Sequence, residues 1–369
     1  MIRMQPKLSP HLHLDRIQGI RLAEDSVENC RAFMLGHGIR NELVVEQIEG
    51  FTHCHMSSAW TAGFAPDNNT LSFQDHARDL TQEILWALLI SPHLFEFKNL
   101  EALASGVRVR ENIANAARKT ALAFKTEAAE RPVAFWQYVE EAGFILQPGA
   151  NLITALISAT QPEATGKLYD FSCYRASEYV ILLGLAQEAH AHHPELFDAL
   201  QKLNEVHAVR SGQFHEVFLH EYGSLAAPLP AHFFVPGDRL WFRNPDEASS
   251  DVTGYEGSWV IYMGGGLFSN FWKRDQPFTL TTKCVEIYHW RDGLQINGQG
   301  EAWMDERIVE ACVADTLANP LKLEKVMALM MRMRDDKGIY AEGGCLDASR
   351  EHPRQIDPSA CELQLPLIN

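Results

Sequence analysis

The sequence predicts an α+β fold in which a buried central helix packs beside an antiparallel sheet. Apolar residues recur at three- and four-residue spacing over residues 75–129, as they do in packed helices. The run Tyr174–Ala189 is apolar on more than one side, which is typical of a helix in the middle of a domain. Over residues 214–290 the pattern changes to short β-rich runs. Helices and strands that are segregated along the chain in this way indicate an α+β protein.

Two or three helices are expected over residues 75–129, where Leu80, Ile84 and Leu88 share one face. The further expected elements before the sheet are a pair of strands over residues 132–146, a helix over 150–159 and a polar helix over 195–207. After residue 299 helices return, with Asn319 as an N-cap and Pro320 at the first helical position. Prolines follow, so we expect about the last thirty residues to form a loosely packed tail.

Short strands are expected in the second half of the chain, because β-branched and aromatic runs alternate there with turn residues. They are Phe214–Leu219, Arg239–Arg243, Ser258–Met263, Leu267–Trp272 and Cys284–Trp290. The triplet Gly264–Gly266 is not followed by Lys-Ser or Lys-Thr, so it indicates a hairpin rather than a phosphate-binding loop.

Cys173 stands where a polar loop ends and the central helix begins, with Ser172 in front of it as the N-cap. A thiol at this place feels the helix dipole and unpaired backbone N–H groups, which favour the thiolate and can hold an oxyanion beside it. A helix that begins with a cysteine and is followed by antiparallel strands is the layout of papain-like cysteine enzymes. The alternative is that Cys173 is a small core residue, as most free cysteines are.

Composition limits the choice of partners. With 32 Lys and Arg against 48 Asp and Glu, the formal net charge is −16, which disfavours nucleic acid and anionic lipid and suits a cationic group such as a lysine amine. The amino terminus lacks a secretory signal, and the longest apolar run, Tyr179–Ala186, is too short to cross a bilayer, so we expect a cytoplasmic protein. The 7 cysteines include no CxxC pair, so we expect reduced thiols.

No cofactor or metal is expected. His53 and His55 would lie on one face of a strand, but no second pair with ligand spacing stands nearby. The sequence also lacks nucleotide, flavin and calcium motifs, so we predict activity that EDTA does not change. No pattern indicates an oligomeric state.

Two phrases of the chain resemble a known family. Tyr169–Cys173 reads Tyr-Asp-Phe-Ser-Cys, and residues 234–264 contain Gly-Asp-Arg-Leu-Trp-Phe-Arg-Asn-Pro followed by Gly-Tyr-Glu-Gly-Ser-Trp-Val-Ile-Tyr-Met-Gly. In this order they resemble the small bacterial protein-glutamine γ-glutamyltransferases, typified by the spore-coat transglutaminase of bacilli. The similarity covers about residues 80–300. The resemblance implies a papain-like cysteine transferase core and acyl transfer from protein glutamine.

The resemblance also assigns residues. Cys173 matches the nucleophile, and Glu256 matches the glutamate at the entry of the facing strand if a short gap is allowed; without the gap that position is Ser258. Ser172 and Asn270 stand where the bacillar proteins have a carboxylate and a histidine. Apart from the resemblance, a carboxyl group flanked by Tyr255 and Trp259 would be partly desolvated and could share a proton with the thiol. His289 is a further candidate for proton transfer.

The function that we predict is formation of isopeptide crosslinks. Cys173 attacks a protein glutamine, ammonia leaves, and the thioester passes to an amine, with lysine as the expected acceptor. Glu256 handles the protons. Trp241, Tyr255, Trp259 and Trp272 would wall a substrate channel and keep water out, although aromatic crowding is equally typical of a core.

Two alternatives stay open. The thioester could pass to water, which would make the protein a glutamine deamidase or amidase, including a toxin that acts on another protein. Alternatively, this is an inactive binding protein, since Ser172 and Asn270 replace polar family residues. We expect an N-terminal extension over residues 1–75, a catalytic domain over 76–300, and C-terminal helices with a tail over 301–369.

Overall fold

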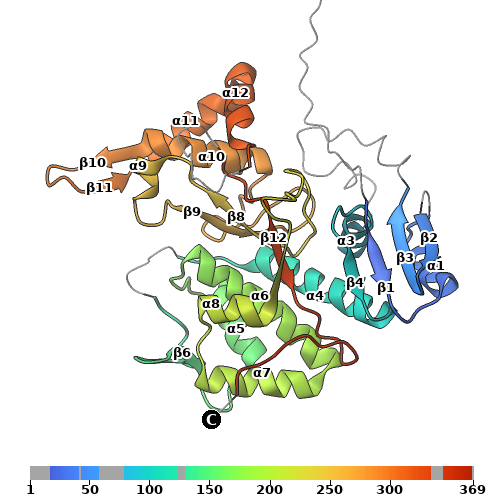
Figure 1. The fold of residues 1–369 in the computed structure, drawn as a ribbon. Helices are drawn as coiled ribbons and strands as arrows, with labels where there is room; N and C mark the ends of the chain where they lie inside the picture. The colour runs from blue at the N-terminus through green and yellow to red at the C-terminus, as the bar shows by residue number, and fades with distance from the viewer. Residues whose placement is uncertain (1–16, 41–42, 58–78, 124–128, 334–343, 368–369) are drawn as a thin grey trace, which may run out of the picture.

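The computed structural model describes residues 17–40, 43–57, 79–123, 129–333 and 344–367. Near the amino terminus a four-stranded sheet has the order β2-β3-β1-β4 (Figure 1). Its strands are β1 Ile20–Leu22, β2 Leu43–Ile48, β3 Phe51–Met56 and β4 Phe95–Phe97. β1 pairs antiparallel with β3 and parallel with β4. The boundary that we expected near residue 75 lies outside the described residues.

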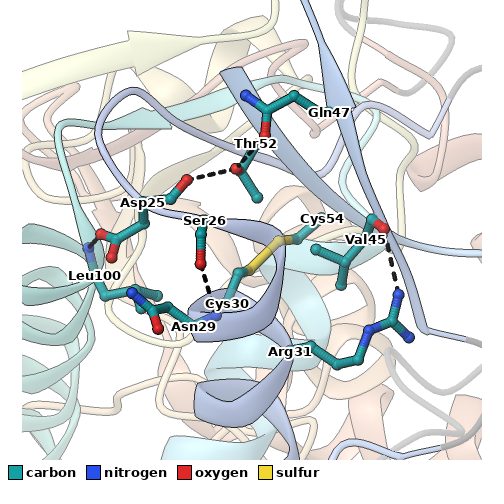
Figure 2. The surroundings of a disulfide bond; sticks show 10 residues. All are labelled: Asp25, Ser26, Asn29, Cys30, Arg31, Val45, Gln47, Thr52, Cys54 and Leu100. Carbon is teal, nitrogen blue, oxygen red and sulfur yellow. Dashed lines mark hydrogen bonds between the residues drawn. A yellow bond between two sulfur atoms is a disulfide. The ribbon is translucent and has the colours of Figure 1, made fainter. Parts of the chain in front are cut away.

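Helix α1 (Val27–Gly36) is fastened to this sheet through Cys30 and Cys54, which form a disulfide (Figure 2). The expectation that all thiols are reduced is therefore wrong for this pair. The buried face of α1 lies over β3, so it brings together two cysteines that are 24 residues apart in the chain, a separation with no recognisable signal. Next to them the Asp25 carboxylate accepts a hydrogen bond from the Leu100 N–H at 2.6 Å, which ties this unit to the next helix.

Of the two or three helices expected over residues 75–129, the described residues contain α3 (Leu80–Leu89) and α4 (Leu100–Lys119), capped by Asp79 and Asn99. α4 then packs along α6 (Cys173–His192), the predicted central helix. The two backbones approach closely at Gly184, where an added Cβ would lie 2.9 Å from the backbone nitrogen of Ile113. Only glycine fits this crossing.

A helical layer lies on the other side of α6 (Figure 1). It contains α5 Leu152–Thr160, a 3₁₀ turn Pro162–Ala164, α7 Pro194–Val206 and α8 Ser211–Phe218, with the hairpin β5 Trp136–Val139 and β6 Gly143–Leu146 beside it. The hairpin, α5 and α7 confirm the predictions for these stretches. The predicted strand Phe214–Leu219 is wrong for most of its length, because its first residues belong to α8.

The second sheet has the order β7-β12-β8-β9. Its strands are β7 Leu219–Tyr222, β8 Arg239–Arg243, β9 Gly257–Ile261 and β12 Arg350–Pro353. β12 comes from the segment that we expected to be a loose tail, and that expectation is wrong: the strand pairs with β7 and β8, and Arg350 is 1% exposed. The predicted strands at residues 239–243 and 258–263 are confirmed by β8 and β9.

The remaining elements are mostly helical. They are α9 Glu247–Ser250, α10 Leu280–Gly293, β10 Leu294–Ile296, β11 Ala302–Met304, α11 Glu306–Ala318 and α12 Pro320–Met330. The predicted strand Cys284–Trp290 is wrong because a capping box at Thr279 and Thr282 starts α10 there. The stretch Leu267–Trp272 contains isolated bridges at Phe268 in place of the predicted strand.

The protein is thus a mixed α and β molecule with two apolar clusters. One joins the N-terminal sheet to β8, β9 and the helices α10 and α12, and the other surrounds α6 with α4, α5, α7 and α8. In the described part of the chain, no helix combines the length and the apolar character that crossing a bilayer requires.

Candidate active site

The site is built around the first residue of α6. Ser172 is the N-cap, as predicted, and its hydroxyl accepts a hydrogen bond from the Arg175 N–H at 3.3 Å. The helix behind it is buried on all sides, with Glu178 and Ala186 both 0% exposed. Cys173 is therefore held at the tip of a rigid helix, and its residue as a whole is partly exposed.

Opposing effects act on the Cys173 thiol. Burial of the sulfur raises its pKa and is the largest effect. Backbone N–H groups of Trp259 and Tyr174 lie at the sulfur and lower the pKa, as does the positive charge of Lys283, whereas the charge of Glu256 raises it. Trp259 belongs to β9, which packs against α6 beside the sulfur.

The two residues whose N–H groups lie at the sulfur, Tyr174 and Trp259, also carry aromatic rings. Trp241 and Trp259 are cross-strand partners on β8 and β9, and their rings stack with centroids 5.5 Å apart and an interplanar angle of 5°. Tyr174, the residue after the cysteine, meets Trp259 edge to face at 5.0 Å. The Arg239 guanidinium lies 4.8 Å from the Trp259 ring centroid. The backbone next to this pair has no room for a side chain, because a Cβ on Gly257 would lie 2.2 Å from the Trp241 indole nitrogen.

Glu256 lies just before β9 and is exposed. Its Oε2 accepts a hydrogen bond from the Gly254 N–H at 3.0 Å. In the described part of the chain, no carboxyl or imidazole group is hydrogen-bonded to the Cys173 sulfur. Tyr255 is half-buried, and its hydroxyl donates to Glu306 Oε1 at 3.0 Å. Burial, followed by the charge of Glu306, raises the pKa of that hydroxyl well above its usual range.

The remaining predicted site residues are distributed over several elements. Ser258 is half-buried on β9 and pairs with Phe242 of β8. Asn270 is 8% exposed and holds a turn, donating to Gln276 O at 2.9 Å. Trp272 packs against the cluster around α6. His289 lies on α10, where it hydrogen-bonds to side chains of α10 and α11.

Lys283 was not among the site residues predicted from the sequence. It lies on α10 and is 3% exposed, with its ammonium 2.9 Å from Glu286 Oε2 and 3.9 Å from the Phe278 ring centroid. Its positive charge lowers the pKa of Cys173 and so favours the thiolate. A helical spacing of apolar residues over 280–293 would have placed Lys283 on a helix that packs into the core. The stretch was instead predicted to be a strand, so this lysine was not considered.

A cavity of about 450 Å³ opens beside Ser172. Arg131, Arg175 and Tyr179 line it, and Arg131 is 4% exposed. The Arg131 guanidinium lies 3.3 Å from the Phe171 ring centroid and donates to the Asp170 carbonyl at 2.9 Å. Burial lowers the pKa of Arg131, because the charged guanidinium loses solvation there. An anionic or strongly polar ligand in the cavity would stabilise the charged form.

The helix that begins at Cys173 is thus buried and lies beside an antiparallel sheet. The family model for TGL, protein-glutamine gamma-glutamyltransferase, matches residues 62–340. The chain belongs to this family. This γ-glutamyltransferase is therefore a cysteine-dependent acyltransferase whose substrates are protein glutamines.

Two further comparisons were made with this γ-glutamyltransferase. A transglutaminase from Geobacillus stearothermophilus, solved without its C-terminal extension, is similar in structure with a TM-score of 0.40 and 18% sequence identity. The match covers 57% of this chain and 97% of that one. No curated protein matches the sequence.

Proposed function

We propose that Cys173 is the acyl-accepting nucleophile of this γ-glutamyltransferase and that lysine is the amine acceptor. The observation that supports it best is the position of the sulfur at the start of a buried helix, with backbone N–H groups of Trp259 and Tyr174 at its surface. These groups offset part of the cost of a buried thiolate. A core of this kind, in which β9 faces the tip of α6, corresponds to the papain-like arrangement.

The proposed reaction has two steps. The Cys173 thiol passes its proton to the Glu256 carboxylate, and the thiolate attacks the carbonyl carbon of a glutamine carboxamide. Backbone N–H groups at the start of α6 stabilise the oxyanion, and the C–N bond breaks as Glu256 gives that proton to the departing ammonia. A lysine amine then attacks the thioester, its proton passes to the Glu256 carboxylate, and the thiolate leaves. The charge of Glu256 acts on the Cys173 thiol, which supports its assignment to proton transfer.

The substrate would meet two different surfaces. The cavity beside Ser172 offers guanidinium groups and aromatic rings for the segment around the reactive glutamine. On the other side of the sulfur, Trp241, Trp259 and Tyr174 form an apolar wall that limits the access of water to the thioester. We place the catalytic domain at residues 76–300, between an N-terminal extension (1–75) and a C-terminal region (301–369). The reaction uses protein groups alone, so EDTA should leave turnover unchanged.

Incorporation of a labelled primary amine into a glutamine-containing protein tests this proposal, together with a separate assay of released ammonia. The wild type is expected to incorporate the amine and release ammonia in equal amounts, and Cys173→Ala to do neither. Ammonia without incorporation would replace transfer by deamidation. If neither product forms with the wild type, the protein is a binding protein and the proposal fails.

The role of Glu256 has its own test. Glu256→Gln keeps the size of the side chain but cannot exchange a proton, so we expect amine incorporation to fall by about 10²- to 10⁴-fold. Alkylation of Cys173 by iodoacetamide should not slow in the same variant, because the carboxylate raises the pKa of the thiol. Glu247→Gln, an exposed position on α9, is the matched control. Full activity of Glu256→Gln would exclude this residue as the proton carrier.

A further inference from the structure

A cluster of potential metal ligands lies where α10 packs against α11. His289 and Asp292 are three residues apart on α10, so they share a face of that helix, and Cys312 belongs to α11. One ligand atom from each of the three side chains lies within 4.8 Å of the others. Their nitrogen, oxygen and sulfur atoms are a donor set that Zn²⁺ accepts in proteins.

The distances suit a single ion. Zinc binds these atoms at about 2.0–2.3 Å, which places ligand atoms of one tetrahedral ion about 3–4 Å apart. The spacing in the cluster therefore requires only small side-chain rotations. Asp292 has a side chain that is 44% exposed, and Cys312 is partly exposed, so an ion can enter from solvent and keep a water molecule as its fourth ligand.

The surroundings of His289 also fit a ligand. The ring is 2% exposed, and its Nε2 lies 2.7 Å from the hydroxyl of Thr316, which is 0% exposed. Its Nδ1 lies 2.6 Å from Asp292 Oδ2. A metal-binding histidine typically donates its second N–H to an outer oxygen, which fixes the ring for the ion. The Thr316 hydroxyl supplies that oxygen, and Nδ1 faces Asp292.

We propose that His289 Nδ1, Asp292 Oδ2 and Cys312 Sγ bind one Zn²⁺ ion that fastens α10 to α11. In the tautomer that carries its proton on Nδ1, His289 donates to Asp292, and the Thr316 hydroxyl donates to Nε2. When the ion binds, the imidazole proton moves to Nε2 and is donated to Thr316, and the Cys312 thiol releases its proton to solvent.

One cation lies close to this site. The Lys322 ammonium is 2.7 Å from Asp315 Oδ2, and it is near enough to Cys312 and Asp292 to interact with their charges. Asp315 neutralises it in part. The negative charges of Asp292, Asp315 and a Cys312 thiolate outnumber the positive charge of Lys322, so the net charge around the site is negative and attracts a divalent cation.

Cobalt provides a direct readout, because a thiolate bound to Co²⁺ absorbs in the near ultraviolet through charge transfer. The full-length protein, stripped with a chelator, is titrated with Co²⁺ and then with Zn²⁺. We expect one Co²⁺ per chain with the charge-transfer band, and loss of that band when Zn²⁺ displaces the cobalt. Cys312→Ser should lose the band, and Asp292→Asn should bind at least about tenfold more weakly.

Two controls separate this site from other thiols. Cys361→Ser removes an exposed cysteine outside the cluster, and Cys173→Ala removes the proposed nucleophile. Both should keep the band and the affinity of the wild type, and circular dichroism of each stripped variant checks that it is folded. Absence of a band from the wild type, or an unchanged band in Cys312→Ser, would overturn the proposal. Neither result depends on whether the protein transfers acyl groups.

Discussion

At the scale of single residues, burial and nearby charges have opposite effects on the thiol of the proposed nucleophile, Cys173. Cys173 lies at a helix start, where a thiolate is favoured, yet burial has the larger effect and raises the pKa of the thiol. Lys283 reduces this cost from a position on α10, far from Cys173 in the sequence. The reactivity of the thiol is therefore expected to depend on a side chain outside the nucleophile helix and its facing strand.

Lys283→Met tests this dependence, because it removes the ammonium and keeps an apolar stem over Phe278. We expect the pKa of Cys173 to rise, so the rate of alkylation by iodoacetamide at neutral pH should fall, by about tenfold for each unit of pKa. The measurement is the pH profile of alkylation in a protein that also carries Cys312→Ser and Cys361→Ser, in which Cys173 is the remaining thiol with solvent exposure.

Lys283→Arg is the matched variant, since it keeps the charge on a stem of similar length. Its profile should stay near that of the wild type. If both variants shift the profile equally, packing rather than charge is responsible. An unchanged profile in Lys283→Met would remove this residue from the site.

At the scale of elements, the sequence predicted those with strong local signals. The N-cap Ser172 and the apolar run behind it identified α6, and Asn319 with Pro320 marked the start of α12, whose Met330 is buried in the core. The β-rich composition of Cys284–Trp290 predicted a strand, but the capping box at Thr279 and burial against α11 and α12 produce a helix. Tertiary packing overrides local propensity at such places.

The sequence likewise predicted only those parts of the candidate site that have local signals. Cys173 and the β9 residues next to it have local motifs, and the structure brings Trp259 to the sulfur. Lys283 and the cavity arginine Arg131 reach the site only through the fold, as Cys30 reaches Cys54. Sequence patterns rely on short spacings, so they do not reveal contacts between residues that are distant in the sequence.

The crossing of α4 and α6 is a prediction at this scale. In Gly184→Ala the new Cβ would lie 2.5 Å from Ile113 Cγ1 and 2.9 Å from the Ile113 backbone nitrogen, so the helices must separate. Overpacking of this kind should lower the free energy of unfolding by about 1–3 kcal/mol, measured by urea denaturation. Gly36→Ala, on α1 with no atom within 4 Å of the new Cβ, should not destabilise the protein. Equal stability of the two variants would contradict the close approach.

At the scale of the whole molecule, β12 joins parts of the chain that lie far apart in the sequence. His352 of this strand packs against Phe95 of the N-terminal sheet and Tyr222 of β7, with ring centroids 5.4 Å away in both cases. The same cluster contains His220, and Arg110 of α4 acts on it electrostatically. Burial, then the charges of Arg110, His220 and His93, hold the pKa of His352 well below its usual value.

This cluster should make stability depend on pH. In the unfolded chain His352 titrates near pH 6.5, whereas in the folded protein it stays neutral to much lower pH, so below about pH 6.5 the unfolded state binds the additional proton. The stabilisation is therefore complete above about pH 6.5 and is lost as the pH falls. His352→Phe removes this group and keeps a ring in the cluster.

Urea unfolding between about pH 5 and 7.5 gives the slope of the free energy of unfolding against pH. A change in packing alters stability equally at every pH, so it does not change this slope. The free energy of unfolding of the wild type should fall more steeply on acidification than that of His352→Phe, by up to about 1.4 kcal/mol per pH unit. His93 and His232, whose pKa values are also lowered by burial, leave a residual slope in the variant. The exposed His192→Phe should keep the wild-type slope. If His352→Phe also keeps the wild-type slope, the contact between β12 and the N-terminal sheet does not hold this histidine neutral. In that case β12 does not join the two parts of the chain in the way that the fold indicates.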